Sequence, residues 1–135
     1  MDSRLDLRLW EGRLLIAIVV AWNLQAALAF LLAPQEFAPQ FELNGASGSV
    51  VVRGMAILFV MWNIPYLAAI WQPRRNRTSA WEAMVMQSIG VLGESFLLLT
   101  LPAGHTSISA ALLRFIAFDA AGAAALIGAI LLTHL

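Results

Sequence analysis

Four ionisable side chains lie within long apolar stretches of the sequence, where a charge is costly unless it has a partner. Glu94 and Asp119 have the chemistry for acid–base work, a proton relay or ligand binding, and Arg53 and Arg114 are their natural counter-ions. At ~1.5 Å per residue from the expected outer helix ends, Glu94 lies about 10 Å deep and Arg53 about 5 Å deep. We therefore expect Arg53 and Arg114 to pair with Glu94 and Asp119 in the outer half of a membrane bundle.

Two interpretations of this charged layer remain open. The balanced charges either fix the register of the helices or build a ligand pocket or proton-relay site. Other polar side chains extend the second interpretation. Gln87 is seven residues before Glu94 and shares its helix face. Asn63 and Tyr66 flank a kink expected at Pro65, which is either purely structural or opens a cavity that these two side chains line. Asn23, in the middle of the first span, is a further cavity candidate, although a hydrogen bond between helices explains it equally.

The elements that must position these groups are membrane helices. Hydrophobic residues make up 61% of the chain and charged residues 12%, with a mean hydropathy of +0.80, which is far from the composition of a soluble domain. Four apolar runs are each long enough to cross ~30 Å of hydrocarbon as a helix. The sequence predicts an all-α, integral membrane four-helix bundle, with residues 1–135 as a single transmembrane domain. The expected spans are about 14–33, 50–71, 80–101 and 110–134.

The fourth span carries small residues at helical spacing, which is typical of a close helix–helix seam in lipid. This expected seam comprises Ala117, Ala121, Ala125, Ala129 and Gly128. It either packs inside the monomer or receives a second copy or a larger subunit.

The loop over residues 72–78 holds the densest cluster of arginines, so the positive-inside rule places it in the cytoplasm. The arginine-bearing N-terminal segment is two spans away and falls on the same side. Both termini are therefore expected to be cytoplasmic.

Several chemistries lack their residues. There is no Cys, which excludes disulfides, thiol catalysis and Cys-ligated metals. His105 falls in a loop and His134 is penultimate, so neither is placed to ligate a pigment at mid-membrane. All eight basic residues are Arg with no extended basic face, so nucleic acid is not expected as a partner. We assign no metal, cofactor or catalytic residue, and a bound lipid or other apolar ligand stays open.

In layout the chain resembles the small four-helix DoxX-like membrane proteins. The resemblance rests on a first span that ends in a proline-containing segment, on Val52-Arg53-Gly54 near the start of the second span, and on Gly93-Glu94 after small residues in the third. It implies a four-helix architecture and a bacterial plasma (inner) membrane. It carries over no catalytic residue, because the activity of such families is poorly defined.

For function, the sequence leads first to a non-catalytic accessory or scaffolding subunit that packs against a larger membrane assembly. The alternative is a small-molecule or proton-coupled carrier or binding protein that uses a charged pocket in the outer half of the bundle. An enzyme is the third choice. The expected partners are membrane lipids, and either other membrane subunits or a second copy held through the fourth helix.

Overall fold

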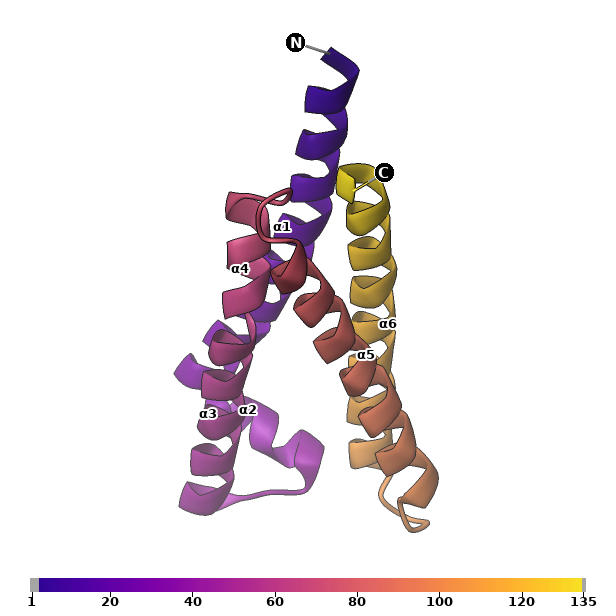
Figure 1. Cartoon of the computed structure of the whole chain (residues 1–135). Coiled ribbons are helices and arrows are strands. Elements are labelled where there is room, and N and C mark those ends of the chain that lie inside the picture. The colour runs from indigo at the N-terminus through magenta and orange to yellow at the C-terminus, as the bar shows by residue number, and fades with distance from the viewer. Residues whose placement is uncertain (1–2, 135) are drawn as a thin grey trace.

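The computed structural model of the chain describes residues 3–134, with side chains from 6 to 133. Within that part, four helical segments are long and apolar enough to cross a membrane: Asp6–Leu32, Gly45–Trp71, Arg77–Thr100 and Thr106–Thr133. The prediction of an all-α, membrane-spanning four-helix bundle is confirmed (Figure 1). The elements are α1 (Ser3–Leu32), α2 (Pro34–Phe37), the 3-10 helix η1 (Ala38–Phe41), α3 (Gly45–Trp62), α4 (Ile64–Trp71), α5 (Arg77–Thr100) and α6 (Thr106–His134).

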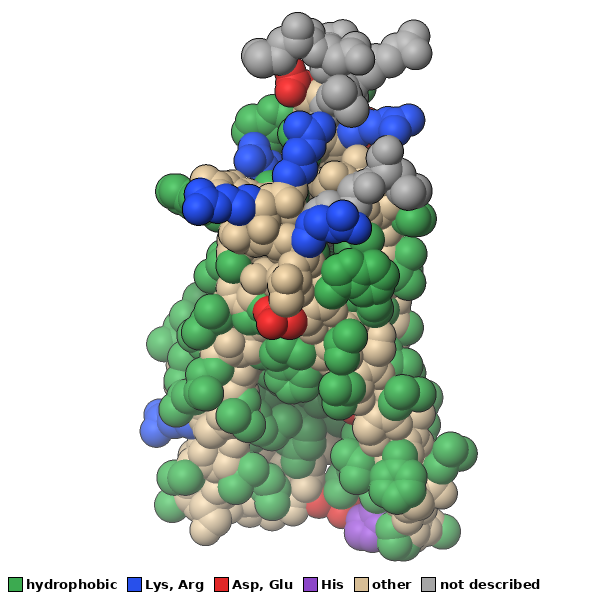
Figure 2. All heavy atoms as spheres, in the orientation of Figure 1, with side chains coloured by type: hydrophobic (Ala, Val, Ile, Leu, Met, Phe, Trp, Pro, Cys, Tyr) green, Lys and Arg blue, Asp and Glu red, His purple; other side chains and the backbone are tan. Residues whose placement is uncertain are grey.

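The two ends of the bundle differ in charge. The start of α1, the α4–α5 connection and the end of α6 lie together at one end, and η1 and the α5–α6 turn lie at the other (Figure 1). Arginine side chains gather at the first end (Figure 2). At the second end, His105 Nδ1 and Glu42 Oε2 are 2.6 Å apart. The predicted arginine-rich loop therefore lies at the same end of the bundle as the start of α1 and the end of α6.

The second membrane span is broken into α3 and α4 at Asn63. Pro65 lacks the N–H that would bond the carbonyl of Met61, which removes one rung of a continuous helix at the position where the sequence predicts a kink. The Asn63 side chain donates from Nδ2 to the carbonyl of Phe59 at 2.7 Å. The break turns Tyr66, the largest fully buried side chain, toward α5.

Small residues allow α1 and α6 to approach closely. A Cβ built on Gly12 would lie 2.4 Å from Thr133 Cγ2 and 3.2 Å from the Ala129 carbonyl oxygen. Ala129 is fully buried, Ala125 packs against the same core, and Gly128 faces Leu15. The C-terminal part of the predicted small-residue seam thus packs inside the monomer.

The N-terminal part of that seam faces outward. Ala117 and Ala121 are exposed, so within the described chain no helix covers them. The face of α6 that α5 covers instead contains Asp119, Gly122 and Leu126. The spacing of four residues identified the internal contact at Ala129 but drifted off the buried face within three turns, because a straight ladder at that spacing winds around a helix of 3.6 residues per turn.

The interior has two apolar clusters. One surrounds Tyr66 near the α4–α5 end of the bundle and includes Ile16, Val19 and Leu126. The other, near η1, is built on Phe30, whose ring contacts four further phenylalanine rings at centroid distances of 4.8–6.4 Å: Phe37, Phe41, Phe59 and Phe115. The candidate site lies beside this second cluster.

Candidate functional site

A chain of buried hydrogen bonds joins three helices. The Tyr66 hydroxyl on α4 lies 2.5 Å from Gln87 Oε1 and 3.2 Å from the Ala83 carbonyl oxygen, both on α5, and donates to these acceptors. Gln87 Nε2 donates in turn to Asp119 Oδ1 on α6 at 2.8 Å. Tyr66 is fully buried and Gln87 is 4% exposed. Each polar group of Gln87 thus has a partner, and the amide orientation is set by its neighbours on both sides.

Two glycines make room for the Gln87–Asp119 contact. A Cβ built on Gly90 would lie 1.8 Å from Asp119 Oδ2, and one on Gly122 would lie 2.6 Å from Gln87 Nε2. On each helix the polar residue and the glycine are three positions apart, and the helices are antiparallel neighbours (Figure 1). Each polar side chain therefore lies over the glycine of the opposite helix, so α5 and α6 meet in one register there.

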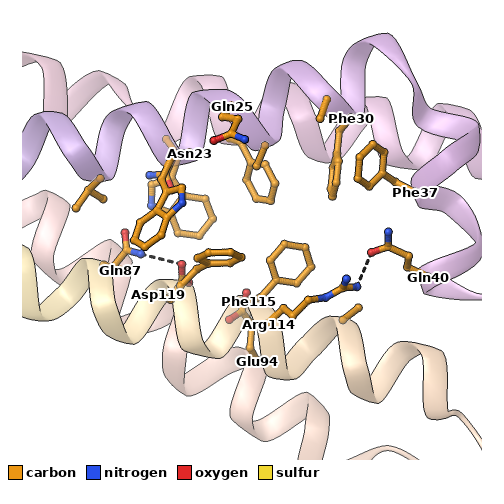
Figure 3. Close-up of a pocket in the computed structure, with 18 residues that line it drawn as sticks. Asn23, Gln25, Phe30, Phe37, Gln40, Gln87, Glu94, Arg114, Phe115 and Asp119 are labelled. Carbon is orange, nitrogen blue, oxygen red and sulfur yellow. Dashed lines mark hydrogen bonds between the residues drawn. The ribbon is translucent and has the colours of Figure 1, made fainter.

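A pocket of about 420 Å³ opens next to this contact, in the half of the bundle that holds η1. Figure 3 shows Asn23, Gln25 and Phe30 on one side of it, and Gln87, Glu94 and Asp119 on the side formed by α5 and α6. Its walls are mostly apolar, with polar groups at a few places, as in small-molecule sites. The aromatic wall comprises Trp22, Phe30, Phe37, Phe59, Trp62, Phe115 and Phe118.

Glu94 lines the pocket without a partner for one of its oxygens. Its Oε2 is buried and has no hydrogen bond. Because Gln87 and Glu94 are seven residues apart, the register fixed at Gln87 also turns Glu94 toward the pocket. The sequence predicted this shared face, and the structure places Glu94, Asp119, Gln87 and Asn23 around the same cavity.

The predicted ion pairs of the charged layer are wrong. Arg114 lines the pocket, but its Nη2 donates to Gln40 Oε1 on η1 at 2.6 Å. Arg53 is exposed, does not line the pocket, and directs its Nε to the Leu31 carbonyl oxygen at 3.4 Å. Among the described side chains, the one contact between a basic and an acidic group at ion-pair distance joins His105 and Glu42. Counting depth along a helix places a residue along the bundle axis but says nothing about its direction around that axis.

Two other cavity candidates lie behind the pocket wall. Asn63 and Tyr66 are both fully buried and neither lines the pocket. Asn63 closes the α3–α4 break, and Tyr66 reaches the site only through Gln87. Of the two interpretations of the kink, the structural one fits these contacts, because Asn63 and Tyr66 bond within the bundle and do not line the pocket.

The η1 segment closes one end of the pocket and was missed as part of the site. Phe37 and Gln40 line the pocket, and the Phe41 ring stacks on Phe115 at 6.1 Å and 10°. Polar contacts hold η1 to α6 through Gln40 and Arg114, and to the α5–α6 turn through Glu42 and His105. The available signal was the spacing of Phe37 and Phe41, which turns both rings to one side. We refer to residues 34–43 as the η1 strap.

The donor set of the pocket favours non-covalent binding. Among the residues that the structure describes, no group of three or more His, Asp or Glu side chains is arranged to hold a metal ion. The pocket instead offers two carboxyl groups, one guanidinium, four amide side chains and an aromatic wall. Such a set suits an apolar molecule with one polar or charged group.

Comparisons of the chain with models of protein families, with curated proteins and with solved structures find no match. The resemblance to the DoxX-like proteins accordingly stays a resemblance in layout.

Proposed function

We propose that this multi-pass membrane protein is a small-molecule binding or carrier protein that takes a largely apolar ligand into the pocket between α1, η1 and α5–α6. The observation that carries the proposal is the pocket itself. It measures about 420 Å³, is walled by aromatic rings, and is lined by Glu94, whose Oε2 is buried without a hydrogen-bond partner. A carboxyl group with a buried, unpartnered oxygen is costly in a stable protein, and a ligand donor bound to that carboxyl group from the pocket would reduce the cost.

The expected sidedness is part of the same proposal. The arginine cluster around residues 74–77 shares one end of the bundle with the start of α1 and the end of α6, which supports cytoplasmic termini. The pocket and the η1 strap then belong to the outer half of a bacterial plasma membrane. A ligand would reach the site from the outer leaflet or from the space beyond it.

Filling the pocket tests the proposal. Ala29 on α1 lines the pocket, so Ala29→Phe places a ring inside it, whereas Ala21→Phe adds the same ring on an exposed face of α1. Protein purified in mild detergent is extracted, and the extract is analysed by mass spectrometry. We expect a small molecule to accompany the wild type and the Ala21 variant and to be lost from the Ala29 variant. Equal extracts from all three folded proteins would contradict the proposal.

A second candidate function is the accessory or scaffolding role. The exposed Ala117 and Ala121, joined by exposed Ala120 and Ala124, form a strip of α6 that a partner helix could approach closely. Ala121→Leu would then reduce recovery of a larger complex from mild detergent, whereas Ala29→Phe would leave that complex intact. The two candidates thus predict opposite responses to the same two substitutions.

A further inference from the structure

The unpartnered oxygen of Glu94 is the most specific chemical feature of the pocket. Asp119 Oδ1 already accepts a hydrogen bond from Gln87, so its role in holding α5 to α6 is satisfied. Glu94 lines the cavity, its Oε2 is buried, and that oxygen has no donor in the described chain. An ionised carboxylate only accepts hydrogen bonds, so a ligand that completes the site beside an ionised Glu94 brings a donor.

The charges around the pocket favour a cation. Two carboxyl groups line it, Glu94 and Asp119, against the single guanidinium of Arg114. The guanidinium is already engaged by Gln40 at the η1 end and lies beyond ion-pair distance from both acids. No other charged side chain lines the pocket within the described residues. With both carboxyl groups ionised, a ligand with one positive charge would balance the net negative charge of the pocket. An anionic ligand would be repelled by that charge.

The aromatic walls of the pocket indicate the chemistry of the remaining, uncharged part of the ligand. Trp22 and Phe118 meet edge to face at 5.1 Å, and the phenylalanine cluster around Phe30 continues the aromatic surface toward η1. Aromatic faces attract cations and bury apolar groups, so they suit both parts of a cationic amphiphile. A volume of about 420 Å³ limits the ligand to a compact molecule.

We propose that the pocket binds a compact primary amine with an apolar or aromatic body, whose ammonium group donates a hydrogen bond to the carboxyl group of Glu94. This inference rests on the proposed binding function and narrows it to a ligand class. The ammonium group lies at the α5 side of the pocket, where Glu94 supplies both the acceptor and the charge. The apolar body lies against Phe30 and Phe115 under the η1 strap.

Three compounds with one common body test the charge of the ligand in the wild-type protein. Phenylbutylamine, phenylbutanol and phenylpentanoic acid carry a cation, a neutral donor and an anion on the same aryl chain. Binding to the purified protein is measured by isothermal titration calorimetry. We expect the amine to bind about tenfold tighter than the alcohol, the effect of one charge-assisted contact, and the acid to bind most weakly. This ranking depends on no variant.

Two variants of α5 test whether Glu94 binds the ammonium group. Glu94→Gln keeps the shape of the side chain and removes its charge, and Glu82→Gln makes the same change at an exposed position of the same helix. We expect E94Q to weaken amine binding about tenfold and to leave the alcohol unchanged, with E82Q like the wild type. Circular dichroism checks that the variants fold.

The outcomes separate the two proposals. Saturable binding of amine and alcohol with equal affinity, insensitive to E94Q, would overturn the ammonium site and leave the binding pocket standing. Tighter binding of the acid would overturn it as well. If none of the three compounds binds saturably and no molecule co-purifies with the wild type, the binding function itself fails.

Discussion

Gln87 Nε2 and Asp119 Oδ1 are joined by a 2.8 Å hydrogen bond between α5 and α6, and each of the two side chains covers a glycine of the opposite helix. This contact sets the register of the two helices. Since Glu94 is two turns beyond Gln87 on the same face of α5, the contact also determines that Glu94 points into the pocket. The hydrogen bond between Gln87 and Asp119 thus positions the face of α5 that lines the pocket.

The glycine opposite Asp119 is predicted to be essential for this register. Gly90→Ala would place a methyl group on the Asp119 carboxyl group, which must rotate away and give up Gln87. We expect a loss of about 1 kcal/mol in the free energy of unfolding, the magnitude of a hydrogen bond between membrane helices. Gly93→Ala is the matched control, because nothing lies within 4 Å of its added methyl. Unfolding in mixed micelles measures both, and equal stability of the two variants would contradict the packing.

The Tyr66 hydroxyl is predicted to stabilise the fold through Gln87. Tyr66→Phe keeps the buried ring and removes the hydroxyl, leaving Gln87 Oε1 without its donor. The expected cost is about 1 kcal/mol in the free energy of unfolding. Trp71→Phe, on an exposed position of α4, should change stability by less than about 0.5 kcal/mol. A fully stable Tyr66→Phe protein would mean that the hydroxyl is not part of the network.

The η1 strap is predicted to open when its polar contacts are removed. The double variant Arg114→Gln, His105→Ala loses the bonds to Gln40 and Glu42. We expect faster hydrogen exchange at the amides of Glu42 and Leu43, which bond Pro39 and Ala38 in the closed strap. Arg74→Gln, an exposed arginine at the other end of the bundle, is the control. Unchanged exchange in the double variant would show that the aromatic contacts alone hold the strap.

The sidedness of the protein is predicted from its arginines. Because the sequence contains no cysteine, single cysteines introduced at the exposed positions Thr78 and Ala103 report without background. In intact cells a membrane-impermeant maleimide should label Ala103→Cys and should label Thr78→Cys only after the membrane is opened. The reverse pattern would place the termini outside.

The fold was predictable because the length and apolar composition of each span indicate a membrane helix. Pro65 likewise indicates the break in the second span. The shared face of Gln87 and Glu94 was predictable for the same reason, since residues seven apart on one helix always share a face. These predictions use information within one helix.

The side-chain contacts between different helices were not predictable from the sequence. Depth arguments paired Arg114 with an acid, whereas the side chain reaches Gln40 in a segment that hydropathy alone leaves as a loop. Gln87 meets Asp119 only because Gly90 and Gly122 let α5 and α6 touch, and no rule of spacing within either helix selects that register. The direction of each helix around its own axis comes from packing with its neighbours.

The tryptophans of the chain offer the most direct test of whether a ligand binds inside the bundle. Trp22 and Trp62 line the pocket, whereas Trp10, Trp71 and Trp81 lie outside it. A variant that keeps only the pocket pair and a variant that keeps only the other three are titrated with bromophenylbutylamine, whose bromine quenches fluorescence at short range. If the compound binds in the pocket, we expect saturable quenching of the pocket pair and only weak, linear quenching of the other three. Equal, linear quenching of both variants would contradict binding in the pocket, because the compound would then be dissolved in the surrounding detergent or lipid.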